Sequence, residues 1–132
     1  MTAAWGGLGY LWNKNVATMY IRPQRYTKEF VDRTDRFTLS FFPEAHRQSL
    51  TLLGRKSGRD GDTIAEAGLP PLYIDGTTAF EEAELILVCK KLYHQELQPD
   101  NFDEKQVAES CYPTGDFHTM YIGEIEKVLV KN

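Results

Sequence analysis

Apolar residues recur along this chain in the short, β-prone runs that are typical of strands. Residues 37–41 alternate strictly between large apolar and hydroxyl side chains, as a half-buried strand does. Residues 16–21, 83–93 and 118–130 are further runs rich in β-branched and aromatic residues. Gly123 interrupts the last run and predicts a bulge or the close approach of another segment. The pattern therefore predicts several strands, two of them long.

Turn signals separate these runs and leave room only for short helices. Asp75-Gly76, between β-prone segments at 72–74 and 77–80, predicts a hairpin with a type I′ turn. Short helices are expected at 28–31 with Thr27 as cap, from Pro43 to a C-cap at Gly54, from a cap at Asp60 or Asp62 through Ala67 to Gly68, and at 102–110. The absence of regular βαβ alternation favours a mainly β fold, an antiparallel barrel with short decorating helices. A length of 132 residues favours a single domain, 1–132.

Composition and charge narrow the classes of function. The net charge is −4, yet residues 13–59 carry ten Lys/Arg against four Asp/Glu, and the rest carries five against fifteen. An acidic chain with one basic part favours a small anion as its ligand. Nucleic acid is disfavoured, because its binding usually requires a basic face over the whole domain. No apolar run approaches the roughly 20 residues that span a bilayer, and the start lacks the pattern of a secretory signal. Cys89 and Cys111 have no metal-type spacing, so we expect reduced thiols and a cytoplasmic protein.

Two basic segments are candidates for the anion site. Residues 22–27 place two arginines and a hydroxyl between a strand and the start of a helix, which are donors that suit phosphate. Residues 54–61 are polar and glycine-rich, and Lys56, Ser57 and backbone N–H groups there suit an oxyanion too, although the Walker spacing is absent. A solvated turn and an exposed connection remain the alternatives for these two segments.

Catalytic chemistry is harder to find. No Gly-x-Ser-x-Gly motif or nucleophile–base pair is present. His118 stands at the entrance to the last strand, and His94, at the end of the preceding long strand, lies close to it if the two strands pair. Together with Asp116 they suggest a metal, but the spacing matches no closed site. A structural or substrate-facing histidine is the preferred interpretation of His118.

An ordered series of motifs identifies a family resemblance over essentially the whole chain. The motifs are Met-Thr-Ala-Ala-Trp-Gly-Gly at 1–7, Arg-Pro-x-Arg-Tyr-Thr at 22–27, Phe-Thr-Leu-Ser-Phe-Phe at 37–42, Ser-Gly-Arg-Asp at 57–60 and His-x-Met-Tyr-Ile-Gly-Glu-Ile at 118–125. This series resembles the flavin reductase-like, FMN-binding split-barrel family, and within it the flavoredoxin-type proteins. The resemblance implies an antiparallel split β-barrel that holds FMN in a groove, usually at a homodimer interface.

The resemblance also assigns roles to particular positions. It implies that the backbone of Thr2, Ala3, Ala4 and Trp5 runs along the isoalloxazine ring, and that the end of a strand at Ser40 and Phe42 borders the flavin. His118 matches a histidine on the substrate side of the ring. The residues implied for the phosphate and ribityl chain are Arg22, Arg25, Tyr26, Thr27, Lys56, Ser57 and Arg59.

This chain departs from the family pattern at its start. Members generally carry a further segment with a strand before the Met-Thr-Ala stretch, and Ala4 stands where a serine is common. A barrel without that strand has an unpaired edge, so we expect either a partner to cover the gap, or the chain to be a fragment or to have a misassigned start. Trp5, Tyr10, Trp12 and Tyr20 concentrate aromatic surface near the N-terminus, a composition that suits a homodimer interface.

The expected function follows from the implied cofactor. The resemblance implies a flavoprotein that transfers electrons from NAD(P)H or a redox partner through FMN to an acceptor. The alternatives are a flavin-binding electron carrier, a storage or sensing module without an NAD(P)H site, and a structural domain that has lost the flavin. The sequence leaves the choice between NADH and NADPH open.

Overall fold

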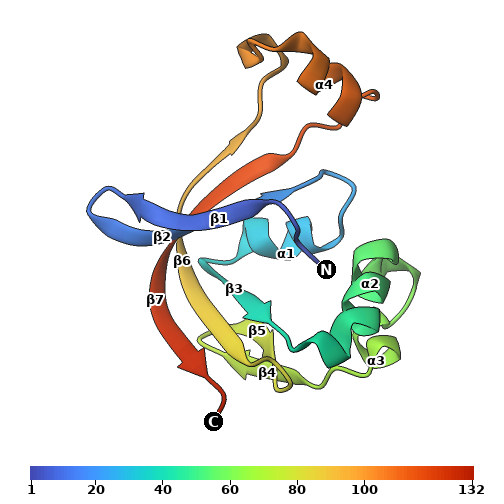
Figure 1. Ribbon diagram of the computed structural model, residues 1–132, viewed down its shortest axis with the longest axis vertical. Coiled ribbons are helices and arrows are strands. Elements are labelled where there is room, and N and C mark those ends of the chain that lie inside the picture. The colour runs from blue at the N-terminus through green and yellow to red at the C-terminus, as the bar shows by residue number, and fades with distance from the viewer.

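The computed structural model describes residues 1–132, and most strands join in one antiparallel sheet (Figure 1). Its five strands lie in the order β1-β2-β7-β6-β3, while β4 and β5 form a separate hairpin. The predicted mainly β, antiparallel fold is confirmed, as is each predicted strand, with small shifts at the ends. The bounds are β1 Gly6–Leu11, β2 Lys14–Ile21, β3 Arg36–Phe41, β4 Pro71–Ile74, β5 Thr77–Phe80, β6 Leu85–Glu96 and β7 Thr119–Val130.

Helices are short and lie in the connections between strands. Asp62 caps α3 as predicted, because its carboxylate accepts from the Ala65 N–H at 3.0 Å, and Gly68 ends that helix in the left-handed conformation. No helix has the length and apolar character needed to cross a membrane. The bounds are α1 Thr27–Arg33, α2 Arg47–Arg55, α3 Thr63–Ala67 and α4 Lys105–Cys111, with 3₁₀ turns η1 Glu44–His46, η2 Gly58–Asp60 and η3 Pro99–Asn101.

The start of α1 differs from the prediction. Thr27 is the first helical residue rather than the cap, and Tyr26 before it already has helical φ and ψ with no capping side chain. A hydrogen-bonded turn runs directly into the helix: Arg25 N donates to Arg22 O at 3.1 Å, and Lys28 N donates to Arg25 O at 3.2 Å. The helix therefore begins on a preceding turn, and the predicted cap at Thr27 was wrong.

The end of α2 also differs from the prediction. The helix continues through Gly54 to Arg55, and Lys56 follows in an extended conformation. Arg25 explains the extension, because its guanidinium donates to the carbonyls of Leu53 (2.9 Å) and Gly54 (3.0 Å). Terminal carbonyls are thus satisfied by a side chain from another segment, so the helix needs no glycine cap at Gly54.

The glycine-rich N-terminal stretch forms a strand that the sequence pattern did not predict. β1 pairs with β2 from Gly6 opposite Met19 to Leu11 opposite Lys14. Trp12 and Asn13 make the turn with φ of 55° and 59°, as a type I′ hairpin requires. Glycines weaken a strand and hide its alternation, which explains the omission. Every residue of β1 is exposed, and the strand is one edge of the sheet.

The core lies on one face of the central strands, under α1. Gly123 of β7 shows the predicted close approach, because a Cβ there would lie 2.7 Å from the Phe37 ring. The β6–β7 register also shifts between Lys91 and Tyr93, opposite this glycine. A second cluster packs the β4–β5 hairpin onto β6. The main cluster comprises Ala17, Met19, Ile21, Val31, Phe37, Leu87, Cys89 and Tyr121, and the second Ala79, Ala83, Ile86 and Val88.

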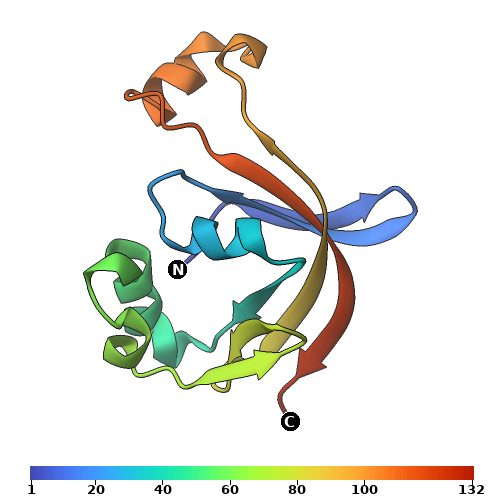
Figure 2. The same ribbon diagram turned by 180° about the vertical axis from the view of Figure 1, so that it is seen from behind.

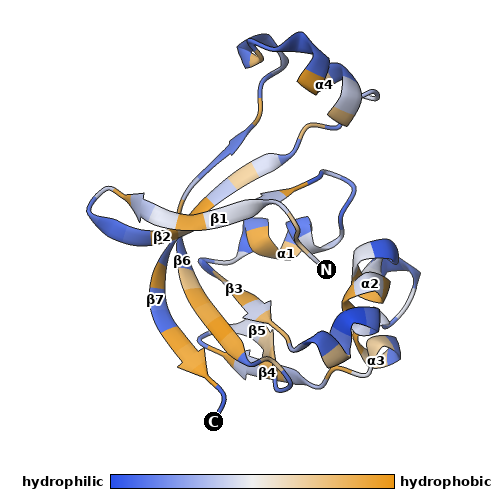
Figure 3. Cartoon of the chain, in the orientation of Figure 1, coloured by the Kyte–Doolittle hydropathy of each residue, from blue (hydrophilic) through white to orange (hydrophobic).

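The connection between β6 and β7 extends away from the rest of the chain. Figures 1 and 2 show η3 and α4 at the far end of this excursion, on the side opposite the C-terminus. Figure 3 shows that the excursion is mostly hydrophilic, whereas the first part of β6 and the last part of β7 are hydrophobic. We call residues 97–118 the excursion; it returns to the sheet at His118, where Leu97 N donates to His118 O at 3.0 Å.

Candidate functional site

The two basic segments pack against each other and form one candidate site. Arg25 of the 22–27 turn holds the end of α2, as described above, and Arg59 of the 54–61 loop donates to the Gln24 carbonyl at 2.9 Å. Gly58 lies against the Tyr26 ring, so that a Cβ there would approach it to 3.0 Å. We call Arg25, Tyr26, Ser57 and Arg59 the basic corner.

Carboxylates neutralise part of this charge. Arg59 lies 5.0 Å from the Tyr26 ring centroid and forms an ion pair with Glu29 of α1 at 3.0 Å. Lys56, predicted to face the same anion, pairs with Glu66 of α3 at 2.6 Å. Ser57 Oγ accepts from the Arg59 N–H at 3.1 Å and so shapes the loop. An anion at the corner therefore competes with Glu29 for the Arg59 guanidinium.

The N-terminal residues connect the basic corner to a second cluster. Thr2 Oγ1 donates to the Leu50 carbonyl, and its side chain lies against Gly54 of α2. Ala3 and Ala4 are exposed. The Trp5 ring then reaches His118, with a centroid distance of 5.1 Å. Residues 2–5 thus run from one candidate region to the other.

His118 lies in an aromatic cluster and is only 8% exposed. Its Nδ1 is 2.6 Å from the Tyr112 hydroxyl, and the Tyr20 ring meets it edge-on at 6.4 Å. Burial lowers the pKa of His118, and the Arg22 charge adds to that effect. The imidazole is therefore neutral near pH 7.

Arg22 belongs to this second cluster and not to the basic corner. Its guanidinium donates to Asp116 Oδ2 at 2.7 Å and to the Cys111 carbonyl at 2.8 Å, and lies 4.9 Å from the Tyr112 ring centroid. Hydrogen bonds from Gln24 and Arg22 hold the pKa of Asp116 well below its usual range. The sequence grouped Arg22 with Arg25, but the guanidinium groups diverge.

Ser40 and Phe42 lie at the end of β3. Ser40 Oγ is the one buried side-chain polar atom of the structure that has no hydrogen-bond partner. Phe42 packs against His46 and Phe80, each at a centroid distance of 5.8 Å. A buried unpaired hydroxyl is costly, so this position suits a ligand that supplies the missing hydrogen bond.

β6, which carries His94, pairs with β7, which begins directly after His118, but the two histidine rings do not meet. His94 is opposite Tyr121 and stacks on that ring at 6.2 Å. Because side chains alternate across a strand, His118, three residues before Tyr121, projects from the other face. No group of three or more His, Cys, Asp or Glu side chains lies together in the structure.

Sequence reasoning missed Tyr112. It lies in the Tyr-Pro-Thr-Gly turn just after α4, and only the return of the excursion brings its hydroxyl to His118. Proximity in sequence to His118 was the available signal, but a turn residue has no periodicity that predicts its direction.

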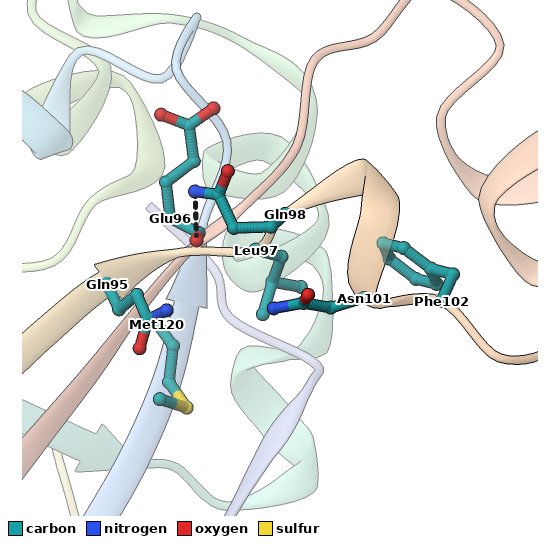
Figure 4. A pocket seen from close by; sticks show the side chains of 7 residues that line it. All are labelled: Gln95, Glu96, Leu97, Gln98, Asn101, Phe102 and Met120. Carbon is teal, nitrogen blue, oxygen red and sulfur yellow. Dashed lines mark hydrogen bonds between the residues drawn. The ribbon is translucent and has the colours of Figure 1, made fainter.

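A shallow pocket of about 230 Å³ opens where the excursion leaves the sheet (Figure 4). Amide and apolar side chains line it, and the Gln98 amide donates to the Glu96 carbonyl at 3.1 Å. The pocket contains none of the predicted site residues. It is lined by Gln95, Glu96, Leu97, Gln98, Asn101, Phe102 and Met120.

Solved structures share this fold at low sequence identity. Flavoredoxin of Desulfovibrio vulgaris (Miyazaki F) matches with a TM-score of 0.75 and 22% identity over 98% of this chain and 60% of its own. An FMN-binding protein from Thermus thermophilus with bound p-hydroxybenzaldehyde matches with a TM-score of 0.74 and 21% identity, over 98% of this chain and 62% of its own. A Shewanella frigidimarina protein with a split barrel domain matches with a TM-score of 0.71 and 22% identity, over 96% of this chain and 57% of its own. The chain thus spans about 60% of the length of these proteins.

The family assignment rests on a match of the sequence itself. A search of curated proteins found no match. The family model for the flavin reductase like domain matches residues 15–132, from β2 through the end of the chain. This chain belongs to the flavin reductase like domain family.

Proposed function

We propose that this chain binds FMN. The family assignment supports this proposal, and the Thermus thermophilus neighbour is described as FMN-binding. The observation that carries it is the basic corner, where the segments that carry Arg25, Ser57 and Arg59 pack against each other although they are distant in sequence. These donors suit a phosphate, and the unpaired Ser40 hydroxyl suits a further polar contact.

We assign phosphate binding first to Arg59, because an anion can replace its partner Glu29, with Arg25 as the neighbouring positive charge. Arg22 ranks behind both because its guanidinium lies in the His118 cluster, where it binds Asp116. The helix start at Thr27 and the loop residues Lys56 and Ser57 complete the set, with Tyr26 supporting Arg59 through its ring. A phosphate that replaces Glu29 as the partner of Arg59 gains a charge-assisted contact of the same kind.

The flavin ring is assigned to the region that the N-terminal residues cross. Backbone N–H groups of residues 2–5 would face the polar edge of the ring, Ser40 and Phe42 would border it, and His118 would face the reaction partner. When bound, FMN supplies the capacity to accept and donate electrons, while the protein supplies orientation and electrostatics.

The proposed reaction passes electrons from NAD(P)H or a redox protein through the flavin to an acceptor. Steady-state oxidation of NADH and NADPH with FMN tests this step. Turnover above the rate of free FMN supports an oxidoreductase, whereas no turnover by an FMN-loaded chain supports an electron carrier.

The free Cys89 and Cys111 suit a reducing compartment such as the cytoplasm, which we propose as the location.

We also propose that two copies associate through the β1 region. Tyr10 is 70% exposed, and Trp5 and Trp12 are 53% and 52% exposed, on or beside an unpaired edge strand. Exposed aromatic residues at a sheet edge favour association. Light scattering behind size exclusion is expected to give twice the 15.1 kDa chain mass, and a monomer at working concentrations contradicts the proposal.

The phosphate assignment is tested by titrating the protein with FMN and with riboflavin, which lacks the phosphate. We expect Arg59→Gln to weaken FMN binding by about 10- to 100-fold and to leave riboflavin binding unchanged, because only FMN uses the charge-assisted contact. The control is Arg47→Gln, since Arg47 also pairs with a carboxylate, Glu44 at 2.7 Å, but lies at the other end of α2. Equal losses for both ligands, or for both variants, contradict the assignment.

A further inference from the structure

The excursion returns to the sheet in a way that fixes one ring nitrogen of His118. Tyr112, at the end of α4, directs its hydroxyl to within 2.6 Å of His118 Nδ1. The other end of the excursion is tied to the same residue, because Leu97 N donates to its carbonyl at 3.0 Å. Both ends of a 22-residue excursion therefore converge on His118.

Aromatic and ionic contacts hold the Tyr112 ring. It is 8% exposed, and the rings of Phe117 and Phe102 lie 4.7 Å and 6.1 Å away. Arg22 lies 4.9 Å from its centroid and ties the turn after β2 to Asp116. The phenol therefore has little freedom to leave His118.

The second ring nitrogen of His118 is left for another partner. No protein group bonds to Nε2. Ser40 Oγ is the only fully buried side-chain polar atom without a partner, so the unpaired Nε2 is not completely enclosed, although His118 is only 8% exposed. The imidazole thus has one nitrogen held by Tyr112 and one without a protein partner.

The protonation states of the pair decide which nitrogen carries the proton. Burial raises the pKa of the Tyr112 hydroxyl, which therefore stays protonated and has a proton to donate to Nδ1. Burial lowers the pKa of His118, which is therefore a neutral imidazole with one donor and one acceptor. When Nδ1 accepts the Tyr112 proton in this bond, the imidazole carries its own proton on Nε2.

We propose that Tyr112 is a positioning residue for His118: its hydroxyl donates to Nδ1, fixes the ring and keeps Nε2–H as the donor offered to the molecule that reacts at this site. The proposal rests on the proposed function for the identity of that molecule, an electron donor or acceptor with a hydrogen-bond acceptor such as a carboxamide oxygen. Arg22 supports the arrangement by fixing the Tyr112 ring.

The first test reads the tautomer directly, in the flavin-free chain. Long-range ¹⁵N–¹H NMR of the histidine ring nitrogens is recorded for the wild type, for Tyr112→Phe and for the control Tyr93→Phe, whose hydroxyl bonds Gln95 instead. We expect His118 to carry its proton on Nε2 in the wild type and in Tyr93→Phe, and to lose this preference in Tyr112→Phe. A proton on Nδ1 in the wild type, or an unchanged tautomer in Tyr112→Phe, overturns the proposal. Should Tyr112→Phe fail to fold, replacement of tyrosine by 3-fluorotyrosine is expected to shift the His118 Nδ1 resonance, and no shift overturns the proposal.

The second test separates positioning from flavin binding. Tyr112→Phe is expected to bind FMN as tightly as the wild type and to lower kcat/KM for NAD(P)H oxidation about tenfold, the effect of one lost hydrogen bond. A weakened FMN affinity with unchanged kcat/KM overturns the positioning role. A wild type that binds no FMN but shows the Tyr112-dependent tautomer refutes the proposed function and leaves the Tyr112–His118 pairing supported.

Discussion

Gly123 passes beneath the Phe37 ring, and replacing it with alanine is expected to destabilise the fold. The added Cβ would lie 2.7 Å and 2.8 Å from two ring carbons of Phe37 and 3.0 Å from the Cβ of Cys89. Neither neighbour has room to move, because Phe37 is 3% exposed and Cys89 is fully buried in the main core cluster. The contact therefore has to be relieved by displacing β7 or the ring.

Overpacking of this kind costs about 1–3 kcal/mol of the free energy of unfolding. For 132 residues the entropy of unfolding is about 0.28 kcal/mol per kelvin, taking about 2.1 cal/mol/K per residue. Gly123→Ala should therefore lower Tm by about 4–11 °C, measured by circular dichroism with urea unfolding as a second method.

The matched control is Gly7→Ala. Gly7 is also a strand glycine, but a Cβ there meets nothing within 4 Å, so its effect should stay within about 0.5 kcal/mol. Phe37→Leu should partly restore the stability lost in Gly123→Ala, because the smaller side chain frees space for the added Cβ. The double variant should therefore be more stable than the sum of the two single effects predicts, by at least about 0.5 kcal/mol. Equal Tm values for the two glycine variants, or additive effects in the double variant, would refute the reasoning.

Three further predictions concern buried polar groups. Cys89 is fully buried and burial raises its pKa to about 12, so a thiol-specific reagent should modify only Cys111 in the native protein, and Cys111→Ser should remove the fast reaction. Burial lowers the pKa of His118, so the native state binds fewer protons than the unfolded state. The free energy of unfolding, measured with urea, should therefore fall as pH drops from about 6.5. The dependence of this free energy on pH should be weaker in His118→Asn. Tyr121→Phe should cost about 1–2 kcal/mol in urea unfolding, because the buried Tyr121 hydroxyl donates to the Asp32 carboxylate.

Each of these has a clear contradicting result. Two rapidly modified thiols per native chain would mean that Cys89 is accessible. A pH slope that His118→Asn leaves unchanged would assign the titration to another group. For the tyrosine, Tyr73→Phe is the control, since Tyr73 is 77% exposed, and equal stability of the two variants would exclude a role for the hydroxyl bond.

Periodicity predicted most of the fold because most strands have one polar and one buried face. The alternation at 37–41, the Asp75-Gly76 turn and the long runs of β6 and β7 all carry local signals that the structure confirms. β1 carries no such signal, because its glycines have no side chains to alternate and all its residues are exposed. The errors at Thr27 and Gly54 share one cause, since tertiary contacts replaced the local caps.

The candidate site was predictable only in part. The family resemblance implied a common region for Arg25 and Arg59, and the structure packs their segments together. The direction of a long side chain is not encoded locally, so the sequence did not separate Arg22 from Arg25. The contact between Tyr112 and His118 depends on the path of the whole excursion, which no spacing rule describes.

The visible absorption spectrum of the protein after incubation with FMN and desalting tests the central claim most directly. A retained two-band flavin spectrum, with about one FMN released per chain on denaturation, is the result we predict. A folded protein, verified by circular dichroism, that elutes colourless and shows no saturable quenching of FMN fluorescence would contradict it.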